Sequence, residues 1–357
     1  MKQIILIAAL LLLNSCVHNP SVKENTFSVD YCKDSIFDWN SRIQIEKVIP
    51  LETKDNCLLS YARKCIVTDD KIIYYDEKQK SIFVFNDTGV FLYEIDALGG
   101  GEGEYTIIKD VIMSYDKKNI LILDDVSILA FDIETGKFQH RIILDENIAS
   151  NFYQFVNVDK ESFYFWSTDK DNCLYSYENG KIDAIQKRMG FPYVCQKFFY
   201  DSTGTLSLLP DYGRFNIQKI KERNVHAKYI FDFGKWTLPQ TLIPVNTMEF
   251  NESDQKPFFK CILSAFETGK YIFLNTVSPD TSLYNICIDK QTKEIISGSQ
   301  DKNAPVVVVD AVGESFYGIL YPFFFSRDDQ FSQEIKKYGK NEDSNPLVIK
   351  FTFKYNQ

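Results

Sequence analysis

The feature that most constrains the fold of this chain is a repeat of short β-strands. Residues 71–95 (KIIYYDEKQKSIFVFNDTGVFLYEI) read as three strands separated by turns, and residues 119–143 (NILILDDVSILAFDIETGKFQHRII) repeat the pattern. Strands rich in aromatic and branched residues end at Asn or Asp, whose side chains cap turns and tolerate left-handed backbone. The repeat predicts a tandem array of small antiparallel sheets.

The spacing of the repeat indicates the architecture. Fainter copies at 173–185 and 282–296 give a period of about 45 residues, which is typical of a four-stranded propeller blade. A blade cannot cover both of its faces, so blades must stack, and closing the ring leaves only short exposed edges. We therefore expect an all-β fold, a six-bladed β-propeller of four-stranded antiparallel blades, with a β-sandwich as the main alternative. The expected blades span 62–98, 107–145, 152–187, 196–233, 258–297 and 306–354, the last completed by 42–51.

Helical periodicity is nearly absent from the chain. The exception is RDDQFSQEIKKYG (327–339), where Phe331, Ile335 and Tyr338 share a face and acidic residues lead. Gly339 can end such a helix. We expect one short helix near the C-terminus of a domain at 43–357.

The N-terminus predicts export. The apolar run Ile4–Leu13 is shorter than the roughly 20 residues of a membrane span and fits a secretory signal. Leu13-Asn14-Ser15-Cys16 resembles the bacterial lipobox, whose cysteine becomes lipidated. We expect a signal peptide at 1–15 and a lipidated Cys16 that begins a tether at 16–42 and anchors the chain to a membrane without spanning it. A cleaved signal that happens to contain a cysteine is the alternative.

Charge and cysteine usage exclude some classes. The formal charge is −9 and no basic run occurs, so nucleic acid is not an expected partner. Of eight cysteines none forms a CxxC pair, and most stand in apolar, strand-like surroundings. We expect them to be small buried hydrophobes rather than a disulfide framework, although an exported protein can form disulfides.

A glycine-rich stretch, DALGGGEGEYTIIKDV at 96–111, invites a functional interpretation. A phosphate loop or dinucleotide fingerprint would require a helix to follow, whereas Tyr105 is followed by a strand pattern. Glu102 and Glu104 are oxygen donors for calcium, but a calcium loop usually supplies more ligands. We therefore favour a connection between blades, in which glycines permit positive φ, over a ligand-contacting rim or a metal loop. The residues of this connection are Gly101, Glu102, Gly103, Glu104 and Tyr105.

This connection also carries a family resemblance. GEGEYTIIKDV, preceded by FNDTGVFLYEI, resembles the G-x-G-P-G-E-Y connection of six-bladed β-propeller lipoproteins of Bacteroidetes, which are NHL-like and TolB-like propellers. Glu102 stands where that family usually has proline. The other matching motifs are Pro50-Leu51-Glu52-Thr53, Phe231-Asp232-Phe233-Gly234 with Leu238-Pro239, and Asn345-Pro346-Leu347.

The resemblance implies a cellular location rather than an enzymatic activity. It implies a lipoprotein of the outer membrane. No acidic run follows Cys16, which favours the periplasmic side over the cell surface.

Enzyme chemistry finds little support. The histidines are His18, His140 and His226, and no GxSxG elbow accompanies them, so we name no catalytic residue. Six-bladed lactonases hold calcium in the central channel through carboxylates and asparagine from several blades. Asp76, Asp124 and Asn275 are the candidates here, with turn capping as the alternative. We expect no cofactor other than this calcium and keep a calcium-dependent lactonase-like hydrolase or lyase as the second hypothesis.

Binding is the favoured function. Propeller loops surround the channel mouth on a rigid support, and Trp166, Tyr193, Tyr212 and Arg214 lie in segments suited to contact sugars or peptides. The alternative is that these aromatic rings fill the wedges between blades. We expect a lipid-anchored module of the cell envelope that binds a glycan, a peptide or a partner protein of the envelope.

Overall fold

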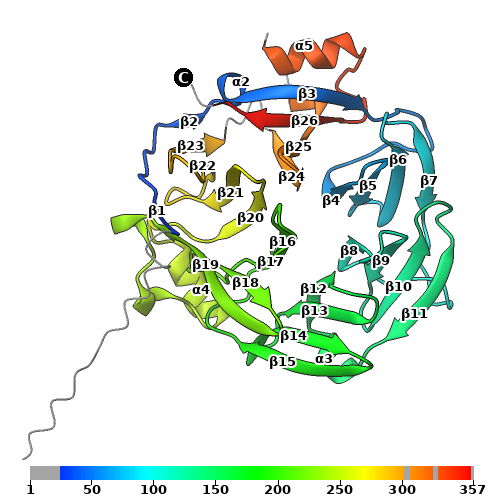
Figure 1. The fold of residues 1–357 in the computed structure, drawn as a ribbon, viewed down its shortest axis with the longest axis horizontal. Helices are drawn as coiled ribbons and strands as arrows, with labels where there is room; N and C mark the ends of the chain where they lie inside the picture. The colour runs from blue at the N-terminus through cyan, green and yellow to red at the C-terminus, as the bar shows by residue number, and fades with distance from the viewer. Residues whose placement is uncertain (1–24, 301–305, 325–328, 355–357) are drawn as a thin grey trace, which may run out of the picture.

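The fold is a closed ring of small sheets. The computed structural model describes residues 25–300, 306–324 and 329–354. Six sheets form a closed ring (Figure 1), and residues of their inner strands line a central channel. The predicted six-bladed β-propeller is therefore confirmed, and the β-sandwich was the wrong alternative. The predicted signal peptide and Cys16 lie outside the described residues.

Each blade runs from an inner strand at the channel to an outer strand at the rim. Blades 1 to 3 contain β4 (Ala62–Val67), β5 (Lys71–Asp76), β6 (Ser81–Asn86) and β7 (Phe91–Ile95); β8 (Asp110–Met113), β9 (Asn119–Leu123), β10 (Ser127–Asp132) and β11 (Phe138–Ile143); and β12 (Phe152–Asn157), β13 (Ser162–Ser167), β14 (Asn172–Glu178) and β15 (Lys181–Lys187). Blades 4 to 6 contain β16 (Phe198–Tyr200), β17 (Leu206–Leu208), β18 (Asn216–Lys221) and β19 (Asn224–Asp232); β20 (Ile262–Glu267), β21 (Tyr271–Val277), β22 (Leu283–Asp289) and β23 (Ile295–Gln300); and β24 (Val307–Val312), β25 (Ser315–Leu320), β26 (Leu347–Phe353) and β3 (Ile43–Pro50).

The ring closes inside blade 6. Strand β3, from the start of the domain, pairs antiparallel with β26, from its end, and Leu347 lies opposite Pro50. The closure joins two motifs that are far apart in the sequence. Leu51 N–H donates to the Pro346 carbonyl at 3.1 Å, and the buried Asn345 side chain donates to the Glu52 carbonyl at 2.6 Å. The Pro50–Thr53 and Asn345–Leu347 motifs therefore form one structural unit.

The predicted tether is partly wrong, because its second half belongs to the propeller. Strand β1 (Thr26–Ser28) pairs in parallel with β19 of blade 4, and β2 (Ile36–Phe37) pairs in parallel with β23 of blade 5. A short helix, α2 (Trp39–Arg42), then buries Trp39 in the core beside Phe273. The apolar side chains within 26–42 explain the docking, since burying them outweighs leaving the segment solvated.

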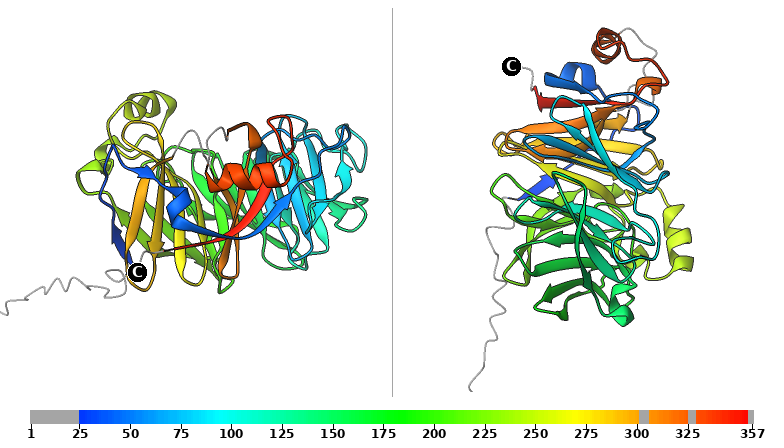
Figure 2. Two further views of the ribbon diagram at one scale, coloured as in Figure 1. Left: turned by 90° about the horizontal axis from the view of Figure 1, so that it is seen from above. Right: turned by 90° about the vertical axis from the view of Figure 1, so that its right-hand side faces the viewer.

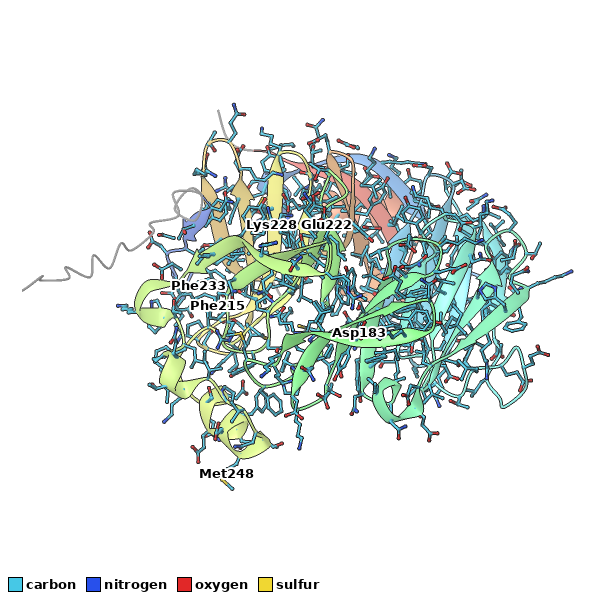
Figure 3. All side chains as sticks on the ribbon, turned by 60° about the horizontal axis from the view of Figure 1, so that its bottom comes forward. Asp183, Phe215, Glu222, Lys228, Phe233 and Met248 are labelled. Carbon is cyan, nitrogen blue, oxygen red and sulfur yellow. The ribbon has the colours of Figure 1, made fainter. Side chains whose placement is uncertain are left out.

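Two eight-residue helices interrupt the β pattern. The predicted helix is present as α5 (Gln330–Lys337), with Asp329 as N-cap and Phe331 and Ile335 buried, whereas Tyr338 is exposed rather than on the buried face. Helix α4 (Thr247–Asp254) was not predicted because its segment lacks an apolar stripe. Met248 of α4 points away from the propeller (Figure 3). The remaining short helices are α3 (Glu146–Ala149), η1 (Gly234–Trp236), η2 (Gln240–Leu242) and η3 (Pro322–Phe324).

The core consists of wedges between blades. Six apolar clusters each join two successive blades, and together they go once around the ring. In the Phe231–Gly234 motif, the Phe233 ring lies 4.9 Å from Phe215 and 3.9 Å from Phe259 between centroids (Figure 3). Six of the seven described cysteines are buried and all seven are free, Cys32 being the exposed one. The interpretation of most cysteines as small hydrophobes is confirmed.

Strand alternation gives the ring two different faces. Connections between blades, and the loops between second and third strands, lie on one face, which we call the upper face. The other two hairpin loops of each blade lie on the lower face. Helices α4 and α5 are both inserted into upper-face connections (Figure 2).

Candidate functional site

The central channel is a large hollow that runs through the ring of blades. It has a volume of about 1480 Å³ and its wall includes residues from the inner strands of all six blades, β4, β8, β12, β16, β20 and β24. Concave surfaces with a few convergent polar groups are the usual binding sites of proteins.

Polar side chains link the inner strands around the channel. At five of the six junctions between neighbouring blades, a side chain in or beside one inner strand makes a hydrogen bond to the neighbouring blade. At blade 2, for example, Asp110 accepts the Lys64 ammonium at 2.7 Å from one side and the Phe155 N–H at 3.2 Å from the other. The remaining links are Asp310 to Val67 N–H, Gln154 to Lys197 N–H and Gln196 to Ala265 N–H. We call this set of links the belt. It keeps the channel open, and it gives the polar groups buried in the channel wall the hydrogen-bond partners that they require.

One carboxyl of the belt has an unusual proton affinity. Burial raises the pKa of Asp310 to about 6, although the Val67 and Ala311 N–H groups and the Lys64 ammonium act in the opposite direction. The Asp310 carboxyl therefore changes charge near neutral pH inside the channel wall.

The lower mouth of the channel presents two exposed aromatic rings. Tyr115 is 64% exposed and Tyr200 is 44% exposed. They lie on either side of Asn157 in blade 3: the Tyr115 N–H donates to the Asn157 side-chain oxygen at 2.5 Å, and the Tyr200 hydroxyl donates to the Asn157 carbonyl at 3.4 Å. The charged side chains at this end are Asp69, Lys117, Asp159, Lys219, Lys221 and Glu222. The arrangement combines flat apolar faces with both signs of charge.

The sequence analysis missed these two tyrosines, although a signal was present. Tyr200 is the last residue of the inner strand β16, and Tyr115 stands in the turn that follows the inner strand β8; an aspartate follows each tyrosine directly. The aspartates cap those turns, as in Thr203 N–H to Asp201 at 2.8 Å. A tyrosine at the end of an inner strand, or in the turn directly after it, lies at the mouth.

Two of the predicted ligand-binding residues are buried instead. Trp166 and Tyr212 are each 1% exposed. The Trp166 indole N–H donates to Asp211 at 3.3 Å, and the Tyr212 hydroxyl donates to Asp254 of α4 at 3.1 Å. Tyr212 is therefore an anchor for the α4 insertion rather than a free ring. The wedge-filling alternative describes Trp166, which packs between blades 3 and 4.

Tyr193 and Arg214 are half-buried on the upper face. Tyr193 packs with Phe250 of α4, with ring centroids 6.1 Å apart. The Arg214 Nε donates to the Met189 carbonyl at 3.0 Å, and Arg214 lines a small cavity together with Trp166. The structure thus brings Trp166 and Arg214 together and places Tyr193 and Tyr212 in a different, aromatic cluster.

The three predicted calcium ligands do not form one site. Asp76 is buried and accepts the Ser60 N–H and hydroxyl, both at 2.6 Å. Asp124 accepts the Thr106 N–H at 3.1 Å and hydroxyl at 2.7 Å. Asn275 belongs to the channel wall, unlike the two aspartates. No cluster of three acidic, His or Cys side chains suited to a metal occurs within the described part of the chain.

The glycine-rich connection joins β7 to β8, as predicted for a link between blades. Tyr105 is buried; its N–H donates to the Ala97 carbonyl and its hydroxyl to the Lys80 carbonyl, both at 2.8 Å. The expected reason for the glycines was wrong, because none of those between 99 and 103 has positive φ. Gly103 permits close approach instead, since a Cβ there would lie 3.0 Å from the Phe138 ring.

The two described histidines line neither the channel nor the small cavity beside Trp166. His140 on β11 and His226 on β19 are exposed on outer strands of blades 2 and 4. Neither lines the channel.

Comparison with known protein families identifies the family of this chain. A sequence profile described as a domain of unknown function, DUF4934, matches residues 35–352. The protein belongs to the DUF4934 family. No curated protein sequence matches this member of the family.

Solved structures share the fold of this DUF4934 protein at low sequence identity. A protein of Bacteroides fragilis named as exported is similar with a TM-score of 0.77 and 15% identity, covering 92% of this chain and 100% of its own. A DUF4221 protein of Bacteroides vulgatus is similar with a TM-score of 0.56 and 11% identity, covering 89% and 99%. A Bacteroides thetaiotaomicron protein of unknown function has a TM-score of 0.50 and 8% identity, covering 88% and 76%. Within the described residues, no helix is long and apolar enough to span a membrane.

Proposed function

We propose that this DUF4934 protein is an exported, lipid-anchored propeller of the cell envelope that binds a glycan at the lower mouth of its channel. The observation that carries the proposal is the exposed pair Tyr115 and Tyr200 on either side of Asn157. Sugar rings have apolar faces that stack on aromatic rings, and their hydroxyls bond to amides and charged groups.

The rest of the mouth supports a polar ligand. Lys219 and Lys221 are exposed on β18 at the lower end of blade 4, where both line the channel. Lysine side chains donate several hydrogen bonds from a flexible stem, which suits ligands with many hydroxyls. The belt of inner-strand hydrogen bonds holds the supporting wall, so little order would be lost on binding.

Export and anchoring rest on the N-terminal sequence. The apolar run and Cys16 fit a lipoprotein signal, and one similar structure is that of a protein named as exported. Attachment through Cys16 would keep the propeller at a membrane surface without a spanning segment. Replacing Cys16 by serine is expected to release the protein into the soluble envelope fraction.

A glycan array probed with residues 22–357 tests the ligand class. We expect binding to a defined set of glycans, and a roughly tenfold weaker affinity in Tyr115→Ala and Tyr200→Ala, which corresponds to about 1.4 kcal/mol. The matched control is Tyr153→Ala, because Tyr153 is an exposed tyrosine that does not line the channel. Binding to peptides but to no glycan, or equal weakening by the control, would contradict the proposal.

A further inference from the structure

A second, smaller cavity opens on the upper face between blades 3 and 4. It has a volume of about 190 Å³, and Trp166, Gln186, Asp211, Arg214, Asn216 and Gln218 supply its polar wall. Met189, Leu208 and Leu209 add apolar surface. The cavity is distinct from the channel, since it lies between the outer parts of two neighbouring blades.

Positive charge is concentrated behind this wall. The side chains of Arg188 and Lys197 are 6% and 0% exposed, and both approach the Asp211 carboxylate, at 3.0 and 3.7 Å. Lys197 also lies 4.6 Å from the centre of the Trp166 ring, and the Arg188 guanidinium lies 5.5 Å from it. Buried charges are costly unless they are balanced.

The charges around the cavity leave a positive excess. Arg188, Lys197 and Arg214 are cations, whereas Asp211 and Asp169 are the nearby carboxylates. Asp169 faces Arg188, and the N–H groups of Asp171 and Asn172 also bond to it. The Arg214 guanidinium uses its Nε for the Met189 carbonyl, and its terminal nitrogens have no hydrogen-bond partner within the described residues.

On the opposite wall of the cavity, one buried hydrogen-bond acceptor has no donor among the described residues. The Gln186 amide nitrogen donates to the Gln218 side-chain oxygen at 3.2 Å, but the Gln186 Oε1 atom is buried and has no hydrogen-bond partner in the described structure. Few buried polar atoms of native proteins lack partners, so such an atom needs an explanation. A bound molecule with an N–H or O–H group would supply one.

We propose that this cavity binds a small carboxylate that also carries hydroxyl or ammonium donors. The carboxylate pairs with the free fork of Arg214, since guanidinium and carboxylate match in a bidentate geometry. The donor groups face Gln186 Oε1, and the apolar part lies against Met189 and Leu208. The volume fits one sugar-acid ring or one small amino acid, and both share this chemistry.

Titration calorimetry on the full chain, purified in detergent, tests the site with glucuronate and with L-alanine in separate arms. We expect one of the two to bind and Arg214→Gln to weaken its binding at least tenfold. Arg223→Gln is the matched control, because Arg223 is paired with Asp183 on the lower face and should leave binding unchanged. Whichever arm binds identifies the source of the carboxylate.

A readout on the wild-type chain keeps the test independent of how the variants fold. The chain has three tryptophans, so three indole N–H signals are expected in a nitrogen–proton correlation spectrum, and Trp166→Phe assigns one. The ligand should shift the Trp166 signal while glucose, which lacks a carboxylate, should not. Binding of neither probe to the wild-type chain, equal binding to Arg214→Gln, or a Trp166 signal that stays unmoved at saturation would overturn the proposal.

Discussion

Asn345 offers a sharp test of how the ring closes. This side chain is buried at the junction of blades 6 and 1 and makes three hydrogen bonds to backbone groups. It accepts the Leu59 N–H at 2.8 Å and donates to the Glu52 and Cys57 carbonyls, both at 2.6 Å. Asn345→Ala removes all three bonds and leaves their partners in a largely buried seam.

The size of the effect follows from these bonds. A buried backbone group left without a partner costs about 1 to 3 kcal/mol. Glu52 and Leu59 keep some access to water, so we expect a loss of about 3 to 4 kcal/mol in the free energy of unfolding. With an unfolding entropy of about 0.7 kcal/mol/K for a domain of this size, Tm should fall by about 5 °C.

Thermal unfolding followed by circular dichroism measures the shift. The matched control is Asn341→Ala in the same insertion, because Asn341 is exposed and caps only a local turn. Asn345→Asp should be similarly destabilised at neutral pH, since a carboxylate accepts the Leu59 N–H but cannot donate to two carbonyls. A Tm of Asn345→Ala within about 1 °C of the wild type, or an equal shift in the control, would refute this account of closure.

Further predictions concern buried charge and backbone. Lys228→Met should cost about 3 to 5 kcal/mol in unfolding free energy, measured by urea titration, because Lys228 Nζ holds Asp201 at 2.8 Å and Glu267 at 2.7 Å in a buried cluster; a loss below 1 kcal/mol would contradict it. Hydrogen bonds, first that of Lys228, lower the pKa of Asp201 to about 2 against the opposing effect of burial, so its stabilisation is full above pH 4 and should disappear as the pH falls through 2. The pKa of Asp310 is instead raised, to about 6. The stabilisation that its protonated carboxyl contributes is therefore full below pH 4 and is lost as the pH rises through 6. A carbon NMR titration of Asp310 with a midpoint near 4 would exclude this. Gly89→Ala should lower Tm, because Gly89 has φ +88° and a Cβ would lie 2.2 Å from the Pro50 carbonyl oxygen; an unchanged melting curve would be evidence against that contact.

The blade pattern could be predicted because it depends on interactions between residues that are close together in the sequence. Asn86 bonds to the Thr88 and Val90 N–H groups within one turn, and Asp132 does the same for Glu134 and Thr135. Such turns need only a few adjacent residues, so they recur wherever the motif recurs. The predicted strands and the closure through 42–51 followed from this repetition.

Which aromatic rings face solvent was not predictable in this way. Both faces of a blade are covered by its neighbours, so β5 is buried at every position and shows no alternation of apolar and polar residues. Without alternation, a sequence does not distinguish a wedge-filling ring such as Trp166 from an exposed one such as Tyr200. Only the stacking of blades separated them.

The sequence by itself determined the strand repeat, the turns and the number of blades, because each depends on local spacing. The tertiary structure alone decided the rest. It brought Asn345 beside Glu52 across nearly the whole chain, placed Arg214 and Trp166 at one cavity between blades 3 and 4, and kept Asp76 and Asp124 apart from Asn275. These relations arise from closing the ring, which sets residues of distant segments against each other in ways that no short stretch of sequence encodes.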